Sequence, residues 1–371
     1  MNRADSLIRP ILFGMLLAPA ALGQAVLETT TVDALSVSAD AVVAGEVIFV
    51  AIGDQKMTGS LMGEDLIVGD GDALTASFTV SQSPDDGPMA SMRCIVFLKR
   101  DIDGWRPLGG ERGFLEVTDS LQIAAIARRV HLARATSLER ERLESWVQDL
   151  GSPVTRLRSD AALCLGHLPE IRWADAEHVA LIGQALGDAQ GTETRSELIR
   201  ALGRTGRPEA AATLIEYATQ LDDLNSLDEV VWALSKLRVD RVAMAFDSVS
   251  PESERGRAIR TCLGGRLGVI AADALMPLLG DSDPAIRCAA VCALRSNGDP
   301  ETIDALDEVL SDASREVRRT ALVTLASFRN EDSTRRLEER RMLEQDPELR
   351  WLIKELLVSP AIHLAPVTPS R

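Results

Sequence analysis

Histidine, the side chain most often used for proton transfer and zinc binding, is scarce in this chain of 371 residues. The four histidines are His131, His167, His178 and His363. None is followed by another at the three- or four-residue spacing that would place two imidazoles on one helix face as metal ligands. The sequence therefore gives no histidine-based metal site, and we expect these side chains at interhelical or surface positions.

Four carboxylates gather in the glycine-rich segment GEDLIVGDGDAL, as Glu64, Asp65, Asp70 and Asp72. Calcium is bound by several carboxylate oxygens from one loop, so a calcium site here is one hypothesis. The spacing does not match an EF-hand, and the alternative is an ordinary solvated loop. The sequence has no glycine loop for phosphate and no nucleophile elbow, so it assigns no catalytic, cofactor-binding or metal-binding residue.

Five cysteines supply the thiols of the chain: Cys94, Cys164, Cys262, Cys288 and Cys292. All but the first lie in apolar stretches of helical pattern, such as ALCLG and CAAVCAL. Cysteine in such a stretch acts as a small buried hydrophobe, which is the role we expect. The alternative is a disulfide, for instance between Cys262 and Cys288, in a chain with an odd cysteine count.

The N-terminus has the pattern of a secretory signal peptide. Arg3 and Arg9 precede the 13-residue apolar run ILFGMLLAPAALG, which ends in small residues. A helix of that length rises about 20 Å, too little to cross a hydrocarbon core of about 30 Å. We therefore expect residues 1–23 to be a cleaved signal peptide, no membrane span to remain, and a periplasmic or extracellular location. A buried helix is the alternative for this run.

The charge balance limits the partners. Lysine and arginine total 40 against 56 acidic residues, for a formal net charge of −16. An anionic surface repels nucleic acid and anionic lipid head groups. We therefore expect no nucleic-acid partner, and a protein or peptide partner that is neutral or basic on its contact face.

Residues 31–118 show the alternation of short strands, which indicates a small all-β barrel or sandwich. Strands are predicted at Asp40–Ile52, Asp72–Ser83, Met92–Asp101 and Gly113–Val117. Gly45 predicts a bulge or bend in the first, Leu74, Ala76, Phe78 and Val80 share one face of the second, and Asp103-Gly104 predicts a tight turn after the third. In ADAVVAGEV, IVFLKR and ERGFLEV the segment also resembles small β domains at the N-termini of exported bacterial proteins of unknown function.

From about residue 137 onward the chain repeats itself, which predicts stacked helix pairs. ALRSNGDPETIDAL (293–306) aligns without gaps with ALGRTGRPEAAATL (201–214). A marker leucine recurs at Leu165, Leu202, Leu234, Leu263, Leu294, Leu325 and Leu356, and an apolar residue stands one helical turn before each. Gly298 is expected to end the first helix in the left-handed conformation, and Ile303, Leu306, Val309 and Leu310 form the buried stripe of the second.

These units resemble HEAT repeats of the short phycobilin-lyase type, over residues 143–358. The resemblance is carried by Asp281–Leu306, Asp312–Phe328 and the degenerate copy Asp346–Leu357. The family's loop aspartate and helix arginine stand at Asp281 with Arg287 and at Asp312 with Arg318, and more loosely at Asp188 with Arg195 and Asp346 with Arg350. We expect them to form a ladder between repeats; an anion-binding row is the alternative. HEAT-like folds include a di-iron hydroxylase with His-Glu dipeptides, which this chain lacks, and export argues against lyase activity on cytoplasmic pigments.

The sequence thus predicts a multidomain protein with an all-β part followed by an all-α superhelical solenoid. The expected divisions are a signal peptide (1–23), a small β domain (31–118), a helical connector (119–142), the solenoid (143–358) and a disordered tail (359–371). The resemblance implies a non-catalytic scaffold that binds a protein or peptide on the solenoid surface. The alternative is a metal-dependent enzyme or enzyme subunit, with a site in the β domain or at its junction with the solenoid.

Overall fold

The computed structural model describes residues 31–51, 56–81, 91–102, 104–109, 113–135, 139–221 and 226–358. The predicted signal peptide, the predicted tail and His363 lie outside these residues. The chain divides into two compact units, one reaching to Ala174 and including Ala189–Ala201, the other comprising Asp175–Asp188 and the chain from Leu202. Each is described by itself below. Among the described helices, none combines the length and the apolar character that crossing a bilayer requires.

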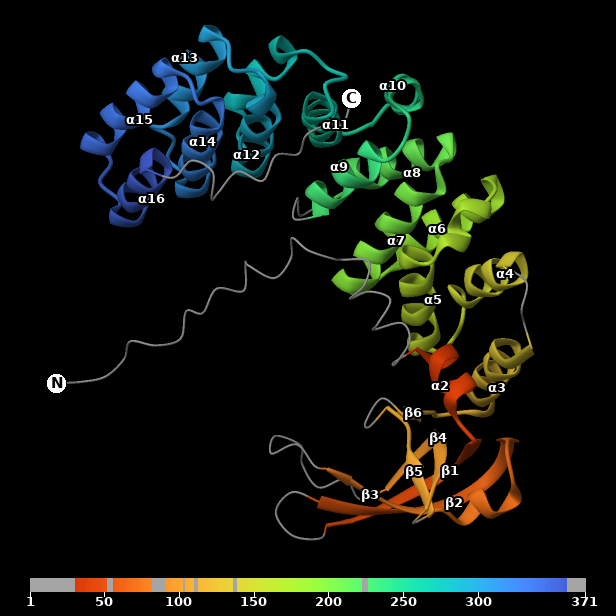
Figure 1. Ribbon diagram of the computed structural model, residues 1–371. Helices are drawn as coiled ribbons and strands as arrows, with labels where there is room; N and C mark the ends of the chain where they lie inside the picture. The colour runs from red at the N-terminus through yellow and green to blue at the C-terminus, as the bar shows by residue number, and fades with distance from the viewer. Residues whose placement is uncertain are drawn as a thin grey trace, which may run out of the picture. The chain divides into compact units, whose positions relative to one another are not determined.

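The first unit contains one antiparallel sheet (Figure 1). Its strands are β1 (Ala41–Ala51), β2 (Lys56–Val68), β3 (Ser77–Ser81), β4 (Ser91–Asp101), β5 (Gly104–Pro107) and β6 (Phe114–Glu116). The order is β3-β2-β1-β4-β5, and β6 pairs with β4. Because β3 and β5, at the two ends of this order, also contact each other, the sheet curls into a nearly closed barrel. The prediction of a small all-β barrel is confirmed.

Successive residues of β1 point into two different cores, as the pleat of a strand requires. Val43 packs inside the curled sheet with Val96 and Phe78. Val42 and Ala44 point to the other face and pack with side chains from the helices α2 (Val32–Ser38) and α3 (Ser120–Ala135). The first part of this strand, residues 41–45, is therefore free of polar side chains because both of its faces are covered, whereas Glu46 beyond it is exposed.

The irregularity predicted at Gly45 as a bulge or bend is present as a bulge, but its extra residue is Glu64 on the partner strand β2. The register of β1 against β2 shifts between Ala44 and Gly45, and Gly45 lies opposite Gly63. A Cβ atom at Gly45 would stand 2.4 Å from the carbonyl oxygen of Met62. Only glycine allows the two backbones to approach this closely.

Two predictions in the β part are wrong. The strand expected at Asp72–Ser83 is shorter, because Gly71–Thr75 forms a 3-10 turn and β3 begins at Ser77. Glu64 and Asp65, expected in a loop, lie on β2, which the sequence analysis missed altogether. Two glycines and few β-branched residues give β2 a weak strand pattern, and pairing with β1 over most of its length overrides that weakness.

Fourteen α-helices, α3 to α16, follow the sheet among the described residues. Those after α3 are α4 (Glu139–Asp149), α5 (Thr155–His167), α6 (Ala176–Asp188), α7 (Thr192–Thr205), α8 (Pro208–Thr219), α9 (Leu227–Ser235), α10 (Val239–Ser248), α11 (Glu254–Arg266), α12 (Pro284–Ala293), α13 (Pro300–Val309), α14 (Arg315–Phe328), α15 (Glu331–Leu343) and α16 (Pro347–Val358). Between α11 and α12 the second helix of the repeat is replaced by two 3-10 turns, Ala272–Ala274 and Met276–Gly280. Pro277 lies inside the latter and has no N–H for a helical hydrogen bond.

The repeat register is confirmed by burial. Each of the seven marker leucines is at most 2% exposed. The residues one turn earlier are also buried, except Leu352 in the last helix, which is half-buried. The stripe Ile303, Leu306, Val309 and Leu310 is buried as predicted. Helix pairs thus stack by their apolar faces, and the predicted HEAT-like solenoid is confirmed as the fold of this region.

The expected ladder between repeats is present at Arg287. Its Nε and Nη2 donate to Asp312 of the next repeat at 2.7 and 2.9 Å, and its Nη1 donates to the carbonyl of Asp281 at 2.7 Å. The Arg287 guanidinium holds the pKa of the Asp312 carboxyl below its usual value. Arg318 repeats the backbone half of the pattern, donating to the carbonyl of Asp312 at 3.0 Å, and its Nε lies 3.6 Å from the carboxylate of Glu344 rather than that of Asp346. At Asp346 the donor is Arg315, at 2.8 Å.

Candidate functional site

The acidic residues predicted as a possible calcium site do not converge. Glu64 pairs with Arg93 at 2.6 Å, and Asp72 pairs with Arg100 at 2.9 Å. Within the described ranges, no group of three or more His, Cys, Asp or Glu side chains is placed to hold a metal ion. Glu64, Asp70 and Asp72 therefore form surface ion pairs with two arginines, Arg93 and Arg100.

All five cysteines are free, so the alternative of a Cys262–Cys288 disulfide is wrong. Cys94, Cys164 and Cys262 are buried, in agreement with the predicted packing role. Burial raises the pKa of the Cys94 and Cys262 thiols to about 12. A thiol attacks as its thiolate, so these groups are poor nucleophiles near neutral pH.

The described histidines have structural contacts. His167 on α5 lies 3.2 Å from the Glu197 carboxylate on α7, which is the interhelical position predicted for it. His178 on α6 lies 2.7 Å from Asp175, which also accepts the backbone N–H of His178. His131 is exposed.

A groove of about 1130 Å³ runs across the first helices of successive repeats in the second unit. Its lining comes from α9, α11, α12, α14 and α16, with the 3-10 turn Leu294–Ser296, and each of these helices contacts the next in that order. Its apolar surface includes Val231, Val323, Leu349 and Leu352, with Trp351 beside them. Trp351 is 60% exposed although it is the largest apolar side chain of the lining.

Five arginines line this groove, and the sequence analysis did not predict them. They are Arg266, Arg295, Arg315, Arg319 and Arg329, against two carboxylates, Asp228 and Glu348. Arg266 pairs with Asp228, Arg315 with Asp346 and Glu348, and Arg319 with Glu316. Arg295 and Arg329 make no ion pair within the part of the chain that the structure describes. The groove is therefore locally cationic in an anionic chain.

Arg329 takes an unusual backbone conformation. It follows α14 with φ 54° and ψ 31°, in the left-handed region, and is the one non-glycine residue with positive φ in the described segments. It stands four residues after the marker Leu325, as Gly206 stands four after Leu202 with φ 67°. Gly298 holds the same position after Leu294, but its φ is not positive, so the left-handed cap predicted there is wrong. An arginine therefore occupies a position that favours glycine.

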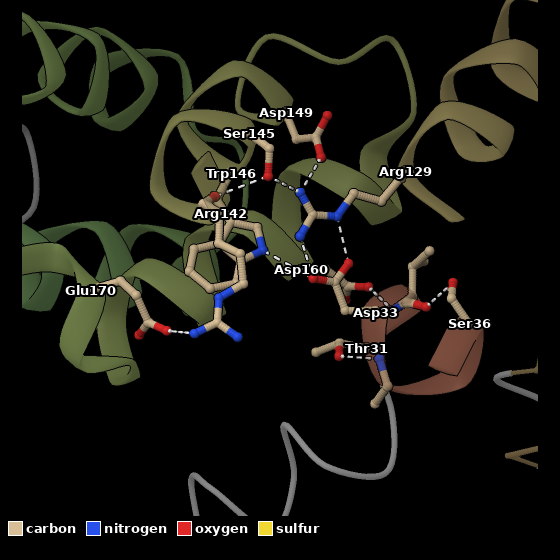
Figure 2. Close-up of polar contacts among 12 residues, drawn as sticks. Thr31, Asp33, Ser36, Arg129, Arg142, Ser145, Trp146, Asp149, Asp160 and Glu170 are labelled. Carbon is tan, nitrogen blue, oxygen red and sulfur yellow. Dashed lines mark hydrogen bonds and ion pairs between the residues drawn. The ribbon is translucent and has the colours of Figure 1, made fainter. Parts of the chain in front are cut away.

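The first unit contains a buried polar cluster, which the sequence analysis also missed (Figure 2). The Arg129 guanidinium on α3 lies between Asp33 on α2 and Asp149 on α4, and its centre is 5.6 Å from the Trp146 ring. Trp146 donates from Nε1 to Asp33 at 3.2 Å. The Arg129 side chain is only 4% exposed. The cluster fastens α2, which precedes the sheet, to helices that follow it.

Asp160 on α5 extends this cluster toward the start of α2. It accepts the backbone N–H of Val32 at 2.7 Å and pairs with Arg156 at 2.9 Å. Burial raises the pKa of the Asp160 carboxyl to about 6, although Arg156 acts in the opposite direction. These contacts join segments more than a hundred residues apart, so no local sequence pattern could have indicated them.

Comparisons with known proteins agree with the helical architecture. A family model described as HEAT repeats matches residues 143–235 and 250–357, more than half of the chain. No curated protein matches the chain.

Among solved structures, three are similar to parts of this chain at low identity. An engineered protein is 19% identical with a TM-score of 0.29, covering 58% of this chain and 95% of its own. The complex of CpcE and CpcF of phycocyanin lyase from Nostoc sp. PCC7120 is 22% identical with a TM-score of 0.31, covering 58% and 94%. A designed armadillo repeat protein in complex with the peptide (KR)4 is 18% identical with a TM-score of 0.27, covering 58% and 98%. Similarity this loose carries no argument about function.

Proposed function

Because the chain belongs to the HEAT-repeat family, we propose that it is an exported, non-catalytic scaffold that binds a protein or peptide partner in the groove of its second unit. HEAT-type solenoids typically present extended surfaces to such partners. The observation that carries the proposal is the exposure of Trp351 beside two arginines without ion pairs in the described residues. Tryptophan and arginine are among the residues most enriched at the positions that dominate binding energy in protein interfaces.

The shape of the groove supports an extended occupant. Its lining is drawn from five successive first helices, so it is longer along the repeats than any single helix pair. A peptide laid across it would meet one helix after another, in the way that stacked repeats build a binding surface. Its lining combines apolar side chains with charged ones, as protein interfaces do.

The non-catalytic part of the proposal is supported by the side chains that could do chemistry. The thiols of Cys94 and Cys262 are held protonated by burial, which raises the pKa of each. Glu64 and Asp72, which motivated the metal-dependent alternative, are paired with arginines. The export part is supported by the N-terminal sequence alone, through its basic start, apolar run and small residues.

The net charge of −16 predicts a partner that is neutral or basic on its contact face. That expectation averages the charge over the whole surface. The net charge of the groove lining has the opposite sign. At 0.1 M ionic strength, charges interact strongly only within roughly 10 Å, so a bound partner interacts mainly with the charges of the lining. We therefore expect the local charge of the groove, and not the average charge of the chain, to determine which partner binds there.

Site-specific photo-cross-linking tests the scaffold. A photoreactive phenylalanine derivative replaces Trp351 in the exported protein, and in a matched control it replaces Trp173, which is 54% exposed in the first unit. We expect one partner to be captured at position 351 and not at 173, and the same partner to bind the purified wild-type protein saturably. Equal capture at both positions, or none at 351, would contradict the proposal.

A further inference from the structure

The charges of the groove are not spread evenly over its five helices. The two carboxylates, Asp228 and Glu348, come from α9 and α16, the first and last helices of the row. The middle of the row contributes Arg295, from the turn after α12, and Arg319, on α14. The central part of the lining therefore carries positive charge without a carboxylate of its own.

The central arginines are available to a ligand. Arg295 and Arg329 make no ion pair in the described part of the protein. Arg319 pairs with Glu316 at 3.0 Å, but both side chains are more than half exposed, and an exposed pair of this kind contributes little to stability. A carboxylate brought by a partner can therefore replace Glu316 at little cost.

The backbone at Arg329 points to the same use. The left-handed conformation is unfavourable for an L-residue, and glycine stands at the equivalent position after α7. The Arg329 side chain is exposed and without an ion pair in the described residues, so no such contact offsets this cost. A left-handed residue after a helix is a common cap but is usually glycine, so an exposed arginine at this position points to a use of its side chain.

From these observations, and resting on the proposed function, we infer that the groove recognises an acidic segment of its partner in extended conformation. Carboxylates of that segment pair with Arg295, Arg319 and Arg329, and an apolar residue beside them packs on Trp351. The guanidinium fork binds a carboxylate through two parallel hydrogen bonds, so arginine is better suited to this task than lysine.

Fluorescence anisotropy with three labelled peptides of equal length tests the charge of the segment. The peptides alternate leucine with glutamate, glutamine or lysine, and the protein is the full mature chain. We expect the glutamate peptide to bind at least about tenfold more tightly than the glutamine peptide, and its affinity to fall as salt is raised. The lysine peptide is expected not to bind.

Two double variants locate the binding. R295Q/R329Q removes the unpaired groove charges, and R341Q/R350Q removes two exposed arginines outside the lining, with the same change in net charge. We expect the first to lose at least about tenfold in affinity for the glutamate peptide and the second less than about twofold. Equal losses in the two variants would overturn the inference.

The remaining outcomes separate the inference from the scaffold proposal. If the glutamine or lysine peptide binds as tightly as the glutamate peptide, and binding depends on Trp351, the scaffold proposal is supported and the preference for an acidic segment is refuted. If no peptide binds, the acidic segment is refuted, and cross-linking at position 351 decides the scaffold independently.

Discussion

Replacement of Arg329 by glycine tests whether an unfavourable backbone conformation is retained for the sake of its side chain. Holding an L-residue in the left-handed region costs about 1–2 kcal/mol. Glycine avoids that cost but gives up about 0.5–1 kcal/mol through the greater freedom of the unfolded chain. The side chain has no ion pair in the described residues that its removal would break. We therefore expect R329G to raise the free energy of unfolding by about 0.5–1 kcal/mol.

Alanine is the matched control, because R329A removes the same charge and keeps the left-handed cost. R329A should be no more stable than the wild type. Both variants should bind the glutamate peptide more weakly, since both lack the guanidinium. In the glycine variant, therefore, stability and binding are expected to change in opposite directions.

The assay is urea denaturation followed by the fluorescence of Trp351, which lies on α16 next to α14. Repeat arrays can unfold in segments, so a probe within the last repeats is preferable to a global one. The remaining tryptophans are replaced by phenylalanine in all three proteins. If R329G proves no more stable than R329A, the conformation at this residue is not costly and strain cannot explain the choice of arginine.

Three further predictions concern the first unit. Because the pKa of Asp160 is raised to about 6 in the folded protein, the charged form of this carboxyl opposes folding above that pH. The free energy of unfolding should therefore rise by about 1 kcal/mol as the pH falls from 7.5 to 5. Denaturant titrations at the two pH values should show this rise in the wild type and not in D160N. R129A should destabilise the unit by about 3 kcal/mol, because it removes the buried ion pairs to both Asp33 and Asp149 and leaves Asp149 only the more exposed Arg128. R128A should cost far less, because it removes one partner of Asp149 and keeps the buried pairs of Arg129; similar losses would argue against the buried network. G45A places a Cβ atom 2.4 Å from a backbone oxygen and should cost more than about 1 kcal/mol by thermal unfolding, unless the bulge can shift.

Periodic features of the fold were predictable because their cause is local. The marker leucines recur at close to one repeat length and face the same side of successive helices, so stacking buries all of them. The bulge at Gly45 was predictable as well, since a glycine inside an apolar strand pattern commonly marks a bulge or a close approach of two backbones.

Features that depend on contacts between distant segments were not predictable. β2 is a strand because β1 pairs with it, although its own residues favour strand only weakly. Arg129 is buried because Asp33 and Asp149, from two other helices, converge on it. The arginines of the groove come from separate repeats, and a net charge averaged over the chain conceals them. A repeated sequence position does not always predict its local conformation either. Gly206 and Gly298 hold equivalent positions in two repeats, but only Gly206 has a positive φ.

The contact between α2 and α3 has a consequence for the topology of the first unit. These two helices flank the sheet in sequence and pack together, so the chain leaves a helical base, forms the sheet and returns to where it started. Such an arrangement is that of an inserted module with adjoining ends, which is the geometry in which whole domains are most easily exchanged. A module that replaces the sheet would therefore have to join the same two chain ends and cover the apolar face of α2 and α3 that the sheet covers here.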